Sequence, residues 1–491
     1  MTEQDQLTTV GELPNRNNAT PLLPAVLTRL VWLLWVATLG VLGARLWTDG
    51  AWSIPGVVAV DGLTVVMWVV VTFFSGIVHS FARRYMAGSN HQTSFFVRVF
   101  AFTLVVMALV AADHIALFGL AWMAMGLVMA DLVGTIKGWP QAAAASSLAR
   151  RYFLGSSALL AVALGILWQS TGATTISGIL AAADTIPQTL LLGAAAALVL
   201  AAMIQSAQIP FHTWLLSSMT APTPASALMH AGFVNAGGIL LVRFAPVISA
   251  DPGVMLAVVA VGGASALGGK LLKSVQTDVK GKLGCSTVGQ MGFMIMQVGL
   301  GFFAAAITHL ILHGFYKAYQ FLSSGSQVEH TAPAETARKT EGVVGVIVTL
   351  VTALAGGWLF AVMTGKGAKV DSGLLLTFFV VFATLHAARN AAQHSSLPAT
   401  IRYGSVPLVF FPAIVVYALV YEGIAGLLPV TTVPTELTLL HGAVAVFFVG
   451  VYIAIETGVH EHSQRLYVAL LNASQPPSDT LLTSTEEYNE Y

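Results

Sequence analysis

Long apolar runs, each of about 20 residues, recur along this chain and are separated by short polar segments. The runs are continuous and do not alternate apolar and polar positions with period two, so they predict helices and not strands. The pattern predicts an all-α fold, a polytopic membrane bundle of about 14 transmembrane helices. The expected spans are 25–47, 57–80, 94–112, 114–135, 148–169, 187–208, 218–247, 252–275, 282–302, 303–325, 341–364, 371–389, 406–428 and 437–457.

Polar residues gather at the two ends of the chain and divide it into three parts. The parts are a polar N-terminal segment, a transmembrane domain and a polar C-terminal tail, over 1–24, 25–457 and 458–491. Three prolines are expected to interrupt helices inside the domain, because proline leaves a backbone carbonyl without its helical partner. Pro210 marks a break within one helix, and Pro222 and Pro224 open the next helix.

The composition excludes a soluble globular protein. Hydrophobic residues make up 56% of the chain and charged residues 9%, whereas soluble proteins carry roughly 25% charged residues. The formal net charge is zero, so we expect membrane lipid, and no nucleic acid, as a partner. The single cysteine, Cys285, cannot build a disulfide framework or a metal cluster alone.

Basic residues in the early loops fall on one side of the predicted bundle. Arg83 and Arg84 follow the second span. Lys137, Arg150 and Arg151 follow the fourth span, and the loops after the first, third and fifth spans are nearly free of basic residues. Basic loops face the cytoplasm, so we expect the N-terminus to be cytoplasmic.

The clearest polar feature inside a span is the pattern HLILHGFYK, which contains His309, His313 and Lys317. A spacing of four places the three side chains on one helical face, one turn apart. Ionisable side chains in a bilayer cost several kcal/mol and persist where they face a hydrated interior or a partner. Because histidine titrates near neutral pH, this ladder predicts a proton relay.

Two other interpretations of the ladder remain open from these residues. The histidines could serve only to hydrogen-bond neighbouring helices, although three ionisable groups on one face fit this less well. A zinc site would need further ligands, and neither His309 nor His313 has an acidic or cysteine companion nearby in the sequence. We therefore expect no metal ion and no cofactor in this chain.

Further polar groups lie inside the spans or at their ends. His230 lies about two turns inside the helix that the prolines open, and Asn235 follows in the same span. Lys270 and Lys273 lie at the end of a later span. Lys270 is the deeper of the two and the better candidate for an ion pathway, because cations near span ends often extend to the interface.

Two more residues complete the predicted ion pathway. Asp131 lies within the fourth span, and no residue nearby in the sequence explains its burial. His386 lies late in the twelfth span, one turn deeper than Arg389, which can extend to the interface.

Several long motifs follow one another in an order that resembles a known family. They are VDGLTVVM, SAQIPFHTWL with APTPASALMHAG, VQTDVKGKLGCSTVGQMGF and HLILHGFYKAYQFLSSGS. Over roughly residues 55–330 the chain is similar to the antiporter-like proton-translocating membrane subunits of respiratory complex I, Mrp antiporters and membrane-bound hydrogenases. The resemblance implies their fold with broken helices. The residues that match the family's central ionisable positions are His230, His309, His313 and Lys317.

Two departures from the family pattern point to a divergent branch. The family's GWE pattern is Ala121-Trp122-Met123 here, so Met123 replaces a pathway glutamate. Gln205 replaces the lysine that precedes the broken helix. The chain resembles most the membrane subunits of DAB-type inorganic-carbon transporters. That resemblance implies a bacterial inner-membrane location and pairing with a large zinc-containing, carbonic-anhydrase-like subunit of the DabA type.

The resemblance implies a transporter subunit that is not itself an enzyme. Entry of a cation, H+ in preference to Na+, would drive CO2 hydration on the zinc-containing partner. One alternative is a proton-pumping subunit of an NADH-quinone oxidoreductase-like complex or a Mrp-type antiporter, against which Met123 and Gln205 count. Another is a membrane anchor that has lost transport, against which the retained ladder counts.

Overall fold

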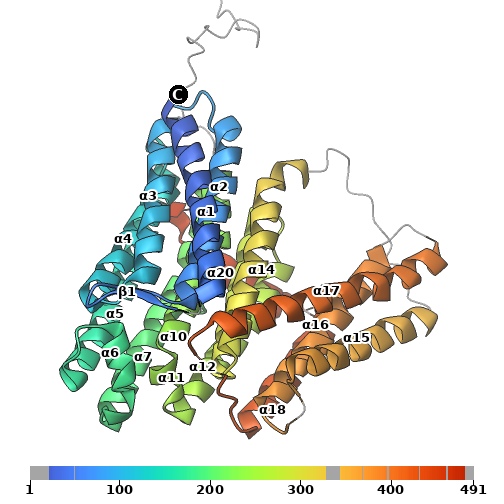
Figure 1. Cartoon of the computed structure of the whole chain (residues 1–491). Coiled ribbons are helices and arrows are strands. Elements are labelled where there is room, and N and C mark those ends of the chain that lie inside the picture. The colour runs from blue at the N-terminus through green and yellow to red at the C-terminus, as the bar shows by residue number, and fades with distance from the viewer. Residues whose placement is uncertain are drawn as a thin grey trace, which may run out of the picture.

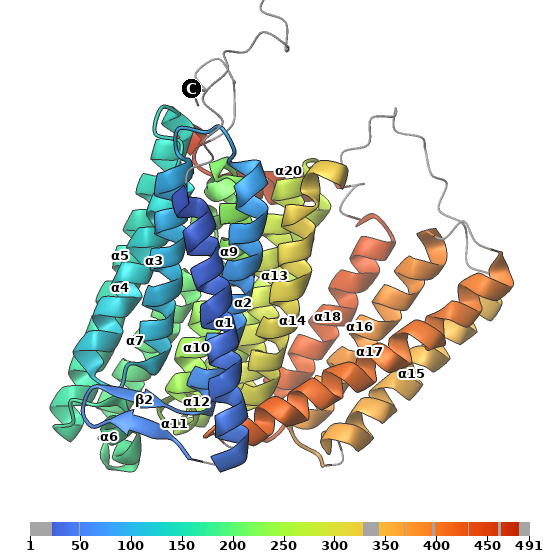
Figure 2. The ribbon, with the colours of Figure 1, turned by 45° about the horizontal axis from the view of Figure 1, so that its top comes forward.

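The computed structural model describes residues 22–48, 50–327, 343–367, 369–394, 398–430, 432–459 and 463–480. Two groups of helices stand side by side within it (Figure 1). The larger group contains α1 to α14, and α15 to α18 lean against its α12 and α14 (Figure 2). Most of the predicted polar segment over 1–24, and the last part of the predicted tail, lie outside the described residues.

The elements follow one another in chain order. The larger group consists of α1 (Leu22–Thr48), β1 (Trp52–Ile54), β2 (Val58–Val60), α2 (Gly62–Tyr85), α3 (Gln92–Ala111), α4 (Ile115–Val133), α5 (Pro140–Thr171), α6 (Ile176–Ala181), α7 (Gln188–Gln205), α8 (Thr213–Ser217), α9 (Thr223–Ala231), α10 (Ala236–Arg243), α11 (Ala245–Ser249), α12 (Pro252–Ser274), α13 (Val279–Gly299) and α14 (Phe303–Leu322). The remaining helices are α15 (Val343–Thr364), α16 (Ser372–His394), α17 (Ala399–Leu427), α18 (Leu439–Glu456) and α20 (Gln464–Ser474).

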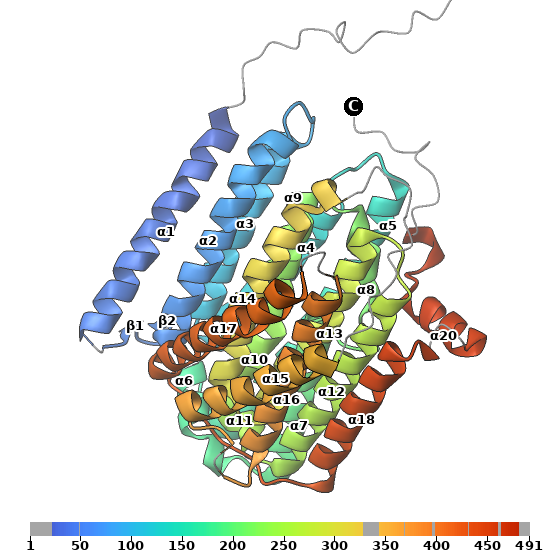
Figure 3. The ribbon, with the colours of Figure 1, turned by 90° about the vertical axis from the view of Figure 1, so that its right-hand side faces the viewer.

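The predicted helical membrane bundle is confirmed. Strands β1 and β2 form a short antiparallel hairpin beside α1, which stands at the edge of the bundle (Figure 3). By length and composition, 11 of the described helices could cross a membrane, so the predicted number of about fourteen is not confirmed. Helices α13 and α14 have 21 and 20 residues, but their polar side chains lower the hydropathy, and the apolar part of α18, Leu439–Ile455, is shorter than the counted spans.

The first break falls where the prolines predict it. Helix α7 ends at Gln205, and the cis peptide bond before Pro210 lies between α7 and α8. Pro222 is the residue before α9, and Pro224 lies in the first turn of α9. The predicted roles of these prolines as helix breaks and helix starts are therefore confirmed.

A further break divides the expected span over 218–247. Helix α9 ends at Ala231, and a single turn of 3-10 helix over Phe233–Asn235 leads into α10. The Asn235 side chain donates a 2.7 Å hydrogen bond to the carbonyl of Ala231, which lost its helical partner at the break. Asn235 thus stabilises the break between α9 and α10, at which the sequence has no proline.

Helices α12 and α13 approach each other closely along glycine-lined faces. A Cβ atom added at Gly262 would lie 2.7 Å from the carbonyl oxygen of Gly292, and one at Gly269 would lie 2.6 Å from the Cα of Gly289. Small residues allow such backbone approach between membrane helices. The pair forms the wall against which α14 and α18 are placed.

One end of the bundle carries the start of α1, the α2–α3 loop and the α4–α5 loop (Figure 2). We call it the basic end, because Arg83, Arg84 and Lys137 lie there; its cytoplasmic placement stays a prediction. Helix α20, within the predicted tail, folds back at this end. The His212 Nε2 atom lies 2.9 Å from the Ala473 carbonyl oxygen, so the tail covers the loop between α7 and α8.

Candidate ion pathway

The predicted ladder forms one column on α14. The imidazole rings of His309 and His313 are stacked, with their centroids 5.9 Å apart. His313 and Lys317 are buried, with 5% and 0% of their surfaces exposed. The Nζ atom of Lys317 donates a 2.8 Å hydrogen bond to the backbone carbonyl of Leu283 on α13.

His230 reaches the column from the side. It is fully buried near the end of α9, and its Nδ1 atom lies 2.9 Å from the Thr287 hydroxyl on α13. Its ring stacks on Phe321, one turn beyond Lys317 on α14, with 4.3 Å between centroids. His230 therefore contacts α14, which carries the ladder, and α13, which accepts the hydrogen bond of Lys317.

A large cavity brings four of the predicted residues together. It lies between α12, α13, α14, α16 and α18 and has a volume of ≈ 400 Å³. The predicted residues that line this Lys270 cavity are Lys270, Lys273, His309 and His386. The Nζ atom of Lys270 lies 2.9 Å from Nε2 of His386.

The Lys270 cavity extends from the basic end towards the ladder. Lys273 and Ile455, which line it, lie in the last turns of α12 and α18 at the basic end. His309 lies within two turns of the start of α14, which is at the opposite end of the bundle. The cavity therefore extends from the basic end of the bundle to His309, the first residue of the ladder.

The histidines present buried nitrogen atoms that lack a protein partner. Among the described residues, Nε2 of His230, His309 and His313 makes no hydrogen bond. Buried polar atoms are almost always hydrogen-bonded, to protein or to ordered water. We therefore expect water molecules at these nitrogens, which is the arrangement through which imidazoles exchange protons.

The expectation that Asp131 is buried is wrong, and its role in the ion pathway stays a prediction. Its side chain is 49% exposed near the end of α4, and its carboxylate lies 2.6 Å from the Arg150 guanidinium of α5. The pairing explains the acid, because a charge on an exposed helix end costs little when a cation lies beside it. Asp131 lines a pocket that no residue of the ladder lines, and Asn235 lines a separate small cavity.

The sequence analysis missed an ion pair between α2 and α10. Asp61 caps the start of α2 and pairs with Arg243, the last residue of α10. Arg243 also donates a 2.8 Å hydrogen bond to the Val110 carbonyl. Burial raises the pKa of Asp61, but the charge of Arg243 and hydrogen bonds from Arg243 and Thr64 outweigh it, so the pKa is lowered. Asp61 lies in the motif VDGLTVVM, but the sequence does not show that Asp61 pairs with Arg243.

Two further polar residues gained a role only from the structure. His79 on α2 is 1% exposed, and its Nδ1 lies 2.8 Å from the Ser75 carbonyl oxygen. Lys280, at the start of α13, donates hydrogen bonds of 3.2 and 3.1 Å to the carbonyls of Met219 and Ala221. Lys280 thereby gives a hydrogen-bond partner to two backbone carbonyls of the segment before α9. The sequence does not show this role, because Lys280 lies near the end of a predicted span.

The two positions that depart from the family pattern carry no charge. Gln205 ends α7 and is 1% exposed, and neither atom of its amide group has a partner among the described residues. Met123 is partly buried on α4. The glutamate–lysine charge coupling of the family is therefore absent at these positions.

Comparisons with known proteins define the class. The family described as NADH:quinone oxidoreductase/Mrp antiporter, TM, matches residues 112–397, and the N-terminal family of complex I chain 5 matches residues 47–96. The chain belongs to this family of membrane subunits and is a multi-span membrane protein. The solved structure of the Mrp complex from Dietzia sp. DQ12-45-1b has the same fold, with a TM-score of 0.63 at 20% identity, over 92% of this chain and 57% of that one.

Within this family, the chain is similar to subunits named as probable inorganic carbon transporter subunits. The chain is 39% identical over 295 residues to the probable inorganic carbon transporter subunit DabB1 of Halothiobacillus neapolitanus, covering 59% of this chain and 52% of that protein. It is 36% identical over 358 residues to the probable inorganic carbon transporter subunit DabB of Bacillus subtilis, covering 71% of this chain and 67% of that protein. The chain thus spans about half to two thirds of the length of these relatives. The resemblance predicted from the motifs is confirmed.

Proposed function

We propose that this chain is the proton-translocating membrane subunit of an inorganic-carbon pump. Proton entry through it is coupled to CO2 hydration on a zinc-containing, carbonic-anhydrase-like partner of the DabA type. The observation that carries the proposal is the Lys270 cavity, which joins the basic end of the bundle to His309 and the ladder. The names of the relatives supply the inorganic-carbon part of the proposal.

The chemistry of the pathway favours H+ over Na+. The Lys270 cavity and the column beyond it offer imidazole and amine nitrogens, from Lys270, His309, His313 and Lys317. These groups accept and release protons, whereas Na+ prefers oxygen ligands such as carboxylates and carbonyls. Among the described lining residues of the cavity there is no carboxylate.

The hydration chemistry is assigned to the partner. Within the described ranges, no three His, Cys, Asp or Glu side chains gather closely enough to hold a metal ion. A zinc site that activates water needs three protein ligands, commonly histidine, cysteine or carboxylate. The chain then acts as a transporter subunit in the bacterial inner membrane, with its basic end in the cytoplasm.

The experiment measures bicarbonate accumulation in a host that lacks carbonic anhydrase. His309→Ala should abolish accumulation while the complex still assembles. His91→Ala, in the loop between α2 and α3, is the matched control and should accumulate normally. The complex is purified in parallel through this chain, and a large zinc-loaded partner is expected. Uptake that survives in His309→Ala, or a complex without zinc, overturns the proposal.

A second candidate function follows from the family description, which covers redox-driven and antiporter subunits. In that case the purified complex would contain redox subunits or further antiporter subunits in place of the zinc protein. Met123 and Gln205 count against it, because charge transfer along those complexes needs the family's ionisable pair. The same purification distinguishes the two functions by the partners recovered.

A further inference from the structure

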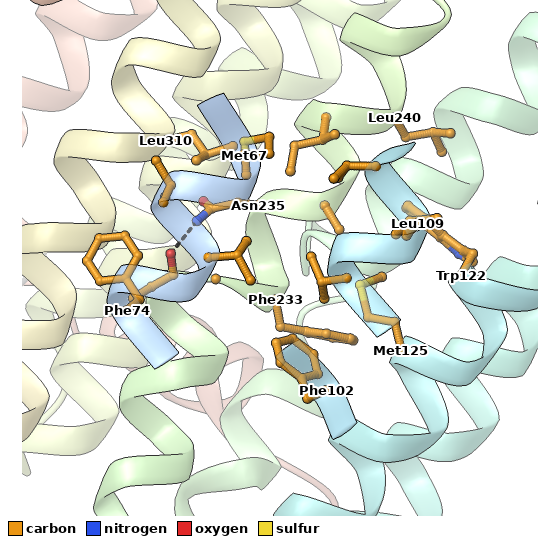
Figure 4. A pocket seen from close by; sticks show the side chains of 18 of the residues that line it. Met67, Phe74, Phe102, Leu109, Trp122, Met125, Phe233, Asn235, Leu240 and Leu310 are labelled. Carbon is orange, nitrogen blue, oxygen red and sulfur yellow. Dashed lines mark hydrogen bonds between the residues drawn. The ribbon is translucent and has the colours of Figure 1, made fainter. Parts of the chain in front are cut away.

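A small cavity lies at the second helix break, away from the Lys270 cavity. It has a volume of ≈ 30 Å³ and lies between α2, α3 and α4 on one side and α9 and α10 on the other. Figure 4 shows Asn235 at its wall, with Phe74, Phe102 and Phe233 around it. This Asn235 cavity exceeds the roughly 10–15 Å³ that one water molecule requires, so it has room for one small molecule.

The polar groups at the Asn235 cavity are nearly all engaged elsewhere. The Asn235 amide nitrogen donates to the Ala231 carbonyl, as the dashed line in Figure 4 marks. The indole N–H of Trp122 donates to Ser156. The amide oxygen of Asn235 is fully buried and has no partner among the described residues. One unpartnered acceptor oxygen therefore belongs to a residue of the cavity wall, which is mostly apolar apart from Asn235, Trp122 and Arg243.

Water is a poor occupant for such a cavity. A buried water molecule usually makes two to four hydrogen bonds, and apolar cavities that cannot supply them stay dry or take apolar molecules. A carbon dioxide molecule makes weaker demands. Its electron-poor carbon is attracted to an amide oxygen, and its two oxygens tolerate contact with aromatic edges such as those of Phe102 and Phe233.

Arg243 forms the boundary of the Asn235 cavity on the side away from the basic end. The same side chain lines a second pocket of ≈ 290 Å³, together with Asp61, Asp113 and Ser177. The guanidinium is engaged by Asp61, by the Thr64 hydroxyl at 3.1 Å and by the Val110 carbonyl at 2.8 Å. The Asp61–Arg243 pair thus separates the Asn235 cavity from this pocket.

We propose that the Asn235 cavity is a binding site for one molecule of carbon dioxide, bounded by the Asp61–Arg243 pair. The choice of carbon dioxide rests on the proposed inorganic-carbon function. The size and apolar walls of the cavity and the single unpartnered amide oxygen define the ligand class: a small, neutral molecule that needs few hydrogen bonds.

The test measures binding of carbon dioxide itself to the full-length chain in its complex. Crystals cooled under carbon dioxide pressure should show a linear molecule at Asn235. In solution, the infrared stretch of ¹³CO2 should show a second, protein-bound band. Val106→Phe fills the cavity and should weaken that band at least about tenfold. Val105→Phe is the matched control, because Val105 precedes it on α3 but does not line the cavity.

A second variant covers the case in which Val106→Phe fails to fold. Val70 also lines the cavity but is only partly buried, so Val70→Phe is easier to accommodate and should remove the bound band as well. Asn235→Leu keeps the walls and removes the acceptor, so the band should weaken several-fold.

The outcomes separate this proposal from the proposed function. Ordered water in the cavity under carbon dioxide pressure, or a bound band that survives both filling variants, overturns the site. Loss of bicarbonate accumulation is not used as a readout here. A bound band in a complex that lacks a zinc partner would therefore support the site while the inorganic-carbon function failed.

Discussion

The amino group of Lys317 on α14 donates a 2.8 Å hydrogen bond to the backbone carbonyl of Leu283 on α13. Lys317 is fully buried and takes part in neither of the ion pairs found among the described residues. A backbone carbonyl fixes the position of the amine without supplying a counter-charge. Lys317 lies at the far end of the ladder from the Lys270 cavity, and the proposed function makes it the group that exchanges protons there.

Replacement of Lys317 should stop proton flow without unfolding the protein. Lys317→Met keeps the length of the side chain but cannot carry a proton, so flux should fall at least about tenfold. Lys317→Arg should fail too, because arginine keeps its proton. Dye-reported proton flux in proteoliposomes measures both, with Lys369→Met at an exposed position as the control. An active arginine variant would show that only the charge matters.

The Asp61–Arg243 pair should contribute stability that depends on pH. Because the folded-state pKa of Asp61 is lowered, its contribution is present above the unfolded pKa and is lost as the pH falls through the folded value. Asp61→Asn should lower the free energy of unfolding near neutral pH by about 1–3 kcal/mol. Thermal unfolding in detergent across the acidic range should then fall less steeply for the variant. An identical slope in both proteins would contradict the role of the pair.

Substitution of Asp131 should have little effect. The ion pair with Arg150 is half exposed, and such pairs contribute roughly 0.2–1 kcal/mol. Asp131→Asn should therefore keep both the melting temperature and bicarbonate accumulation close to those of the unchanged protein. Lost accumulation in a normally assembled complex would return Asp131 to the ion pathway.

The close approach of α12 and α13 should be sensitive to single methyl groups. Gly262→Ala places a Cβ atom 2.7 Å from the Gly292 carbonyl oxygen, so we expect a loss of about 1–3 kcal/mol. Gly165→Ala is the matched control, because a Cβ atom there would meet nothing within 4 Å. That control should be neutral or slightly stabilising. Equal melting temperatures for the two variants would show that the helix pair can separate at no cost.

Much of the fold and part of the site could be predicted from the sequence, because those features are local. Apolar runs define spans, Pro210 breaks a helix and Pro222 starts one, and a spacing of four puts His309, His313 and Lys317 on one face. Each of these rules concerns residues within a few turns of one another. The motifs also carried the family resemblance, which the comparisons confirmed.

Only the tertiary structure decided which helix faces meet. The sequence contains Asp61 and Arg243 but not their contact across 182 positions, and it shows Asp131 without the Arg150 that explains it. It places His309 and Lys270 in different spans, whereas packing puts them in one cavity. Such contacts depend on the rotation and crossing of whole helices, which many weak packing interactions fix together. The sequence by itself thus determined a membrane bundle with a column of ionisable groups, and the packing decided which cavity that column meets.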